Sequence, residues 1–319
     1  MLAAMSASFH PEPLSDLISR RLVLVTGKGG VGKTTVTAAV GRLGVQAGKR
    51  VLVGEMGAAP GAPSSLRQVL TGESAPLPEE PVELLPGLDA VLLTPQAGHR
   101  AFLRDVLPLG FLADRALRTE ALKRFLSAAP AFAELGILYR GLQLVREEKR
   151  GQPRWDLVVL DSPASGHALA FATLPEVALK IIPGGPMGRA LRAGHELLTD
   201  PAKTVALVTT LPETLPVTEA LELIAGLEKS RVLVKGVVAN LVPEDPFTES
   251  EHALLDRYLA KGGAPEGILG TRSLGRLKRA RSALERLRAQ MGETIYTVRE
   301  HASRGPELVH HVVSELTTA

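Results

Sequence analysis

The sequence predicts a doubly wound α/β fold, with a mainly parallel sheet and a helical subdomain inserted into it. Short apolar runs without polar alternation recur along the 319 residues, as is typical of strands that helices cover on both faces. Segments with helical spacing separate these runs. Because crossovers between parallel strands are right-handed, this alternation leads to the doubly wound order.

The first strand is expected at residues 21–26, where an apolar run stands directly before a glycine-rich loop. A helix follows at 33–47 and a second strand at 51–53, and residues 54–65, rich in Gly, Ala, Pro and Ser, are expected to form a loop. The remaining predicted strands lie at residues 88–94, 155–160, 204–209, 233–239 and 295–298.

Residues 95–154 interrupt this alternation. Apolar residues recur there at helical spacing, and Phe102, Phe111, Phe125 and Phe132 all lie in this stretch. We therefore predict that the helical subdomain occupies about 95–154. It either buries its apolar side chains on the sheet or offers a groove to a substrate or partner protein, and the sequence favours neither alternative.

A second helix is predicted near the C-terminus, where Leu277, Ala280, Leu284, Leu287 and Met291 follow a spacing of three and four residues. Many Arg and Lys residues surround this apolar seam. These cations either form a patch that binds nucleic acid or a membrane, or they are a solvated basic face above a packed apolar seam. We favour the solvated face.

The composition excludes several classes of protein. Apolar residues make up 45% and charged residues 22% of the chain, as in an ordinary globular protein. The net charge of +3 gives no electrostatic case for nucleic acid. The absence of cysteine excludes disulfides, thiolate metal sites and iron–sulfur clusters. No apolar stretch is long enough to cross a membrane, and no secretory signal is recognisable, so we expect a cytoplasmic protein. Residues 1–20 are expected to be a peripheral extension of the domain at 21–319.

Residues 27–35, which read Gly-Lys-Gly-Gly-Val-Gly-Lys-Thr-Thr, carry the strongest motif. The spacing from Gly27 to Gly32, followed by Lys33 and Thr34, satisfies the phosphate-binding P-loop pattern. In such a loop, backbone amides and a helix N-terminus converge on one anion. Lys33 is expected to reach the β- and γ-phosphates and the Thr34 hydroxyl to hold Mg²⁺. The predicted nucleotide-binding residues of the loop are Gly27, Lys28, Gly29, Gly30, Val31, Gly32, Lys33, Thr34 and Thr35.

A second motif begins at Asp161, which ends the fourth long apolar run. A carboxylate at the end of a buried strand beside a P-loop is placed to bind Mg²⁺ through water. Pro163 and Gly166 follow it and suit a loop that changes conformation when the γ-phosphate is lost.

Lys28 adds a second lysine to the P-loop, directly after its first glycine. This arrangement resembles the deviant Walker A loop of dimeric ATPases with the P-loop NTPase fold. The resemblance implies ATP and Mg²⁺ as ligands. It also implies that Lys28 reaches across a dimer interface to the phosphates on the partner subunit, which is either a second copy or a related ATPase.

Further motifs resemble one branch of these enzymes, the arsenite-pump and tail-anchored-protein-targeting ATPases. Gly166 and His167 after Asp161 are similar to that branch's switch II segment. Its Pro-Glu pair is matched by Pro212 and Glu213, and the second Glu of its motif, on the following helix, is matched by Glu219. Asn240 matches its adenine-contacting asparagine. The resemblance implies ATP hydrolysis, with a protein client on the helical insert as a possibility.

The chain departs from this family at the position of its switch I aspartate, which positions the attacking water. Gly57 stands there, with Glu55 two residues earlier. Three alternatives follow: Glu55 orients the water, Glu55 only pairs with a P-loop lysine, or the subunit hydrolyses ATP slowly or not at all. The predicted catalytic residues are therefore Lys28, Lys33, Glu55 and Asp161.

Two further functions stay open at this point. One is a positioning ATPase that binds DNA or makes a peripheral membrane contact. Residues 306–319 carry no Lys or Arg, which counts against a basic membrane-binding helix at this end. The other is a subunit that binds nucleotide without hydrolysing it, alone or in a hetero-pair. No transmembrane segment is predicted, and nucleic acid is not a favoured partner.

Overall fold

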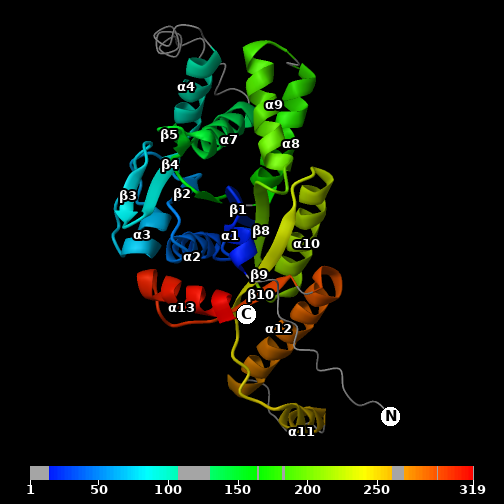
Figure 1. Cartoon of the computed structure of the whole chain (residues 1–319). Helices are drawn as coiled ribbons and strands as arrows, with labels where there is room; N and C mark the ends of the chain where they lie inside the picture. Colours follow the sequence, from blue (N-terminus) through cyan, green and yellow to red (C-terminus); the bar gives the residue numbers. More distant parts are fainter. Residues whose placement is uncertain are drawn as a thin grey trace.

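The computed structural model describes residues 14–106, 130–163, 165–181, 184–260, 269–292 and 294–318. An eight-stranded sheet with the order β10-β9-β8-β1-β7-β2-β4-β3 lies at its centre, with helices packed around it (Figure 1). All neighbouring strands are parallel except β3 and β4. The predicted fold class is confirmed.

All of the predicted strands are present. They are β1 (Leu22–Gly27), β2 (Val51–Met56), β4 (Leu88–Leu93), β7 (Leu157–Asp161), β8 (Thr204–Thr210), β9 (Val234–Val242) and β10 (Ile295–Arg299). β2 runs three residues into the expected loop at 54–65. A Cβ built at Gly54 would lie 2.7 Å from the Leu160 side chain, so this glycine serves close packing of neighbouring strands rather than a turn.

Several elements were not predicted, β3 and α3 among them. β3 (Val82–Leu85) is the antiparallel edge strand, and its exposed side chains lack the apolar run that identifies the buried strands. α3 (Ser65–Thr71) is a short helix that follows the predicted loop. Its cap residue is Ser64, whose hydroxyl accepts from the backbone N–H of Arg67 at 2.9 Å.

Side chains alternate between the two faces of the sheet. On one face, Val23 and Val25 of β1 pack in a core with α2 (Lys33–Gln46), α3 and α13 (Gly305–Thr318). α1 (Leu14–Ile18) joins this core through Leu17, which is 1% exposed. This part of the predicted extension therefore packs against the domain.

Among the described residues, the helices packed on the other face are α7 (Pro130–Arg146), α8 (Ser165–Ile181), α9 (Gly185–Thr199), α10 (Thr214–Lys229) and α12 (Leu269–Met291). α7 buries Leu138 and Leu142 against the sheet. α4 (Pro95–Val106) packs on α7 so closely that a Cβ built at Gly98 would lie 1.7 Å from the carbonyl oxygen of Gly136.

Residues 95–154 are thus helical in α4 and α7, followed by a short hairpin of β5 (Glu148–Lys149) and β6 (Gln152–Pro153). Figure 1 shows α4, α7, α8 and α9 together at one end of the molecule. The middle of the predicted subdomain, residues 107–129, lies outside the described residues.

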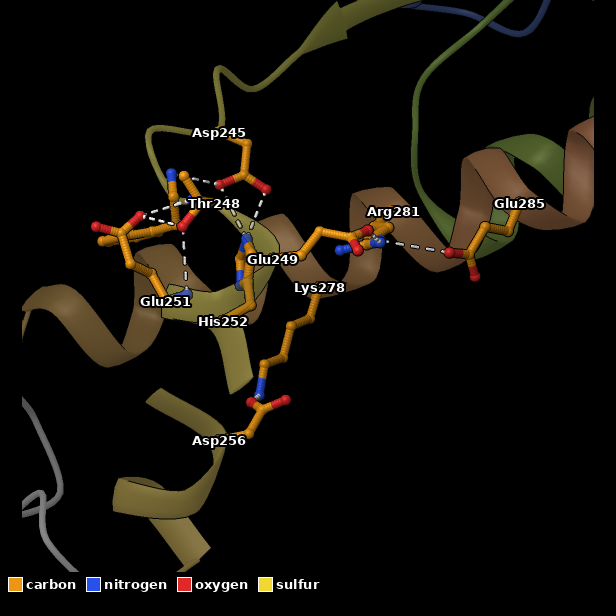
Figure 2. Close-up of polar contacts among 10 residues, drawn as sticks. Asp245, Thr248, Glu249, Glu251, His252, Asp256, Lys278, Arg281 and Glu285 are labelled. Carbon is orange, nitrogen blue, oxygen red and sulfur yellow. Dashed lines mark hydrogen bonds and ion pairs between the residues drawn. The ribbon is translucent and has the colours of Figure 1, made fainter. Parts of the chain in front are cut away.

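The predicted basic helix is α12, and its apolar seam is buried except for Met291, which is half-buried. Its cations meet acids: Arg276 pairs with Glu300 at 2.8 Å, and Lys278 and Arg281 pair with acids of α11 (Glu249–Ala260), as Figure 2 shows. These contacts support the solvated basic face. Within the described part of the chain, no helix is both long and apolar enough to cross a bilayer.

Candidate nucleotide-binding site

The P-loop joins the end of β1 to the start of α2, and two of its glycines are required by their surroundings. Gly27 has φ +147°, and a Cβ there would lie 2.2 Å from the Thr209 carbonyl oxygen of β8. Gly32 has φ +90°, and its Cβ would lie 2.2 Å from Asn240 Nδ2. A larger residue at either position clashes and is strained, so only glycine fits the loop at these two points.

Asn240 ties the loop to β9. Its buried side-chain amide donates to the carbonyl oxygen of Val31 at 2.9 Å. Val31 is itself buried. Asn240 therefore fixes the shape of the P-loop from beneath, a structural role that the sequence motif did not suggest. Its predicted contact with adenine stays a prediction.

Lys33, the first residue of α2, folds back over the loop. Its Nζ donates to the carbonyl oxygen of Lys28 at 2.9 Å. Burial lowers the pKa of Lys33, and the charge of Asp161 partly offsets this effect. Among the described residues, Lys33 has no carboxylate within ion-pair distance. A partly desolvated cation without a counterion attracts an anion into the loop.

Thr34 and Asp161 meet at the ends of α2 and β7. The Thr34 hydroxyl donates to Asp161 Oδ2 at 2.6 Å. Asp161 is 6% exposed, and its Oδ1 is buried without a hydrogen-bond partner among the described residues. Burial raises the pKa of this carboxyl to about 6, against the opposing effects of Thr34 and Lys33.

This pair fits a magnesium ion. Mg²⁺ prefers hard oxygen ligands and keeps several waters, so a hydroxyl and one carboxylate beside a phosphate site suffice. An unpartnered buried carboxylate oxygen is costly unless a cation or donor approaches it. The residues that would hold Mg²⁺ are therefore Thr34 directly and Asp161 through water.

Glu55 lies at the end of β2, 5% exposed. Its carboxylate accepts from the hydroxyl of Ser64 and from the backbone N–H of Ser65, the latter at 3.1 Å. It makes no ion pair with Lys28 or Lys33 in the described residues. Glu55 thus anchors the start of α3, a contact that the sequence did not predict. Gly57 follows with φ +86°.

Lys28 turns away from the loop. Its Nζ pairs with Glu219 of α10 at 2.7 Å, and its side chain is half-exposed. In this state the second lysine of the motif is paired within its own chain. The sequence motif included Glu219 as its second Glu but gave no indication that Lys28 is its partner.

The segment after Asp161 is described in part. Pro163 precedes α8, and Gly166 and His167 lie in the first turn of that helix. The position of the His167 side chain lies outside the described structure. α8 starts only four residues after Asp161.

A cavity of about 440 Å³ opens beside the carboxyl ends of β8 and β9. Pro212 and Glu213 of the Pro-Glu motif line it, as do Arg276 and Arg279 of α12. The sequence gave no sign that these arginines approach the site, because they lie more than 60 residues further along the chain.

The comparison with known families agrees with this geometry. Residues 20–183, more than half of the chain, match the family model described as anion-transporting ATPase. The chain belongs to this family. The matched range contains the P-loop and Asp161, so the predicted resemblance to arsenite-pump-type ATPases is confirmed.

Several curated relatives carry ATPase names. The chain is 29% identical over 233 residues to ATPase BagA of Mycobacterium tuberculosis, covering 71% of this chain and 66% of the relative. It is 29% identical over 239 residues to the arsenical pump-driving ATPase of Escherichia coli, covering 71% of this chain and 36% of the relative. It is 26% identical over 165 residues to ATPase ASNA1 homolog 2 of Paramecium tetraurelia, covering 51% of this chain and 46% of the relative. The matches thus span from about a third to about two thirds of these relatives.

Proposed function

We propose that this chain binds ATP with Mg²⁺ in the loop of residues 27–35 and hydrolyses it as a nucleotide-driven switch. The observation that carries the proposal is the Thr34–Asp161 contact at 2.6 Å, with a second carboxylate oxygen buried and unpartnered beside it among the described residues. Membership of the ATPase family supports the same activity.

Each residue of the loop has a distinct task in this proposal. The backbone amides between Gly27 and Lys33 surround the phosphates, and Lys33 exchanges its bond to the Lys28 carbonyl for the β- and γ-phosphate oxygens. The Thr34 hydroxyl continues to donate its hydrogen bond to Asp161, and its oxygen lone pairs are available to Mg²⁺. Bound Mg²⁺ supplies charge neutralisation on the phosphates. Asp161 must be ionised for this task.

Dimer closure would require Lys28 to change partners. The ion pair with Glu219 is partly exposed, and such pairs contribute only about 0–1 kcal/mol. A γ-phosphate on a neighbouring subunit can therefore displace Glu219 from the Lys28 ammonium. The neighbour is either a second copy of this chain or a related ATPase.

Slow turnover is part of the proposal. Glu55 already accepts two hydrogen bonds from Ser64 and Ser65, and Gly57 has no side chain. The family's aspartate position therefore has no carboxylate, and Glu55, its possible substitute, is already hydrogen-bonded to α3. Without such a group, in-line attack loses both positioning and proton acceptance.

Calorimetric titration of ATP with Mg²⁺ into the purified chain tests binding. We expect Lys33→Ala and Thr34→Ala to weaken ATP binding about tenfold or more, the size expected for lost bonds to charged groups. Lys229→Ala, which removes an exposed lysine at the end of α10, is the matched control and should bind as the wild type does. Wild-type affinity in Lys33→Ala would contradict the proposed site.

The contact of Glu55 with α3 favours a second candidate, a nucleotide-binding subunit without hydrolysis of its own. Single-turnover measurements with radiolabelled ATP and excess protein separate the two functions. Slow release of phosphate that Lys33→Ala abolishes supports an ATPase. Tight binding without phosphate release over many hours supports the second candidate.

A further inference from the structure

A second polar cavity lies in the helical end of the molecule, among α4, α7 and α9. Its volume is about 590 Å³, which is in the range of small-molecule sites. It shares no residue with the P-loop. The residues that line it are Asp105, Tyr139, Arg140, Gln143, Arg146, Glu147, Arg189, Ala190 and Ala193. Three arginines against two acids make its wall basic.

The two acids of the wall are already engaged. Asp105 accepts from the Tyr139 hydroxyl at 2.5 Å. Burial, followed by this contact with Asp105, raises the pKa of Tyr139 against the opposing effect of the nearby Arg146, so the phenol stays neutral and keeps its proton toward the carboxylate. Glu147 accepts from Arg154 at 2.6 Å, and Arg154 lies outside the cavity wall. The charge of Glu147 is thus compensated by Arg154, whereas Asp105 is hydrogen-bonded by a neutral phenol and keeps its charge.

The arginines differ in how far they are paired. Arg140 is 11% exposed and donates to Gln143 at 2.8 Å and to the exposed Glu80 at 2.9 Å. Arg146 donates through Nε to the backbone carbonyl of Leu142 at 3.2 Å, a contact that fixes its direction without neutralising its charge. Arg189 makes no ion pair with any described residue. Two guanidinium groups, one from α7 and one from α9, therefore face the cavity without a carboxylate partner in the described structure.

We propose that this arginine pocket, defined by Arg146 and Arg189 with Arg140 behind them, binds a small ligand through an oxyanion group, either a phosphate or a carboxylate. A guanidinium presents parallel N–H groups that match the two oxygens of such an anion, and bonds of this kind are among the strongest polar contacts in proteins. The volume leaves room for the body of a small organic molecule beyond the anion. The absence of cysteine in the chain fits a hard oxyanion rather than a thiol-binding ligand.

The pocket is tested by calorimetric titration of inorganic phosphate and, separately, of succinate into the full chain. Because phosphate also suits the P-loop, the titrations are run with saturating ADP and Mg²⁺ and repeated on Lys33→Ala. We expect at least one of the two probes to bind, and Arg146→Gln and Arg189→Gln each to weaken its binding about tenfold or more. Arg288→Gln, which removes an exposed charge of α12, should bind as the wild type does.

Several outcomes would overturn the proposal. One is that neither probe binds. Another is that binding survives in Arg146→Gln and Arg189→Gln but disappears in Lys33→Ala, which would place the anion in the P-loop. An equal loss in Arg288→Gln would indicate general charge attraction only. Thermal unfolding of each variant checks its fold. The Lys33→Ala titrations exclude anion binding in the P-loop whether or not the wild type binds ADP. Failure of the wild type to bind ADP would therefore count against the proposed ATPase but not against the arginine pocket.

Discussion

Replacing Asp161 with asparagine should weaken magnesium binding but stabilise the fold. Magnesium binding requires the ionised carboxylate, whereas the metal-free fold is more stable when this buried group is neutral. Burial raises its pKa from 3.8 to about 6 in the folded chain. One pKa unit corresponds to about 1.4 kcal/mol, so the ionised carboxylate costs the metal-free fold about 3 kcal/mol. Asparagine has nearly the same shape and still accepts a hydrogen bond from Thr34, but it carries no charge.

The sign of the effect depends on pH. A group whose folded pKa lies above its unfolded value binds more protons in the folded state, so its contribution to stability is complete below about pH 4 and is lost as the pH rises through about 6. We therefore expect Asp161→Asn to be about 2–3 kcal/mol more stable than the wild type at pH 7.5 without Mg²⁺. The difference should vanish near pH 3.5, where both side chains are neutral.

Urea unfolding followed by circular dichroism measures this difference at each pH. Addition of ATP and Mg²⁺ at pH 7.5 should stabilise the wild type more than Asp161→Asn, because the stabilisation grows with the affinity for the ligand. Asp156→Asn is the matched control. Arg50 lowers the pKa of Asp156 to about 2, so this replacement should destabilise the chain at pH 7.5. An Asp161→Asn chain less stable than the wild type at pH 7.5 would refute the reasoning.

Three further substitutions test the contacts of Lys28, of Glu55 and of the P-loop. Glu219→Gln releases Lys28 from its ion pair and should tighten ATP-dependent dimerisation up to about fivefold in sedimentation experiments; weaker dimerisation would count against the exchange of partners. Ser64→Ala leaves a buried carboxylate short of a donor and α3 without its cap, and should lower stability by about 1–3 kcal/mol in urea unfolding. Ser65→Ala should change little, because only the backbone of that residue is used. Gly32→Ala should abolish ATP binding in calorimetry, because its Cβ would meet a side-chain amide at 2.2 Å.

The sequence predicted the parallel strands well because their signal is local. Buried strands such as β8 (Thr204–Thr210) are apolar throughout, and each strand end could be placed within a few residues. The P-loop was equally readable, since its glycines, lysine and threonine are contiguous. β3 was not predicted, because an edge strand with exposed side chains lacks the continuous apolar pattern of a buried strand.

Sequence reasoning named Lys28, Asn240 and Glu55 as site residues but missed the partners that they have in this structure. Lys28 meets Glu219 from another helix, and Asn240 meets Val31 from 209 residues away. Glu55 is separated from Ser64 by only nine residues, but its direction depends on where α3 packs. Spacing rules give the chemistry of a side chain and the strand end on which it sits; they do not give its hydrogen-bond partner.

Sedimentation velocity with a slowly hydrolysed ATP analogue and Mg²⁺ tests the central claim most directly. The wild type should be a monomer without nucleotide and a dimer with it. Lys28→Ala should bind the analogue in calorimetry and remain a monomer. A chain that never associates on binding nucleotide, with or without a related ATPase present, or a Lys28→Ala variant that dimerises as well as the wild type, would contradict the account.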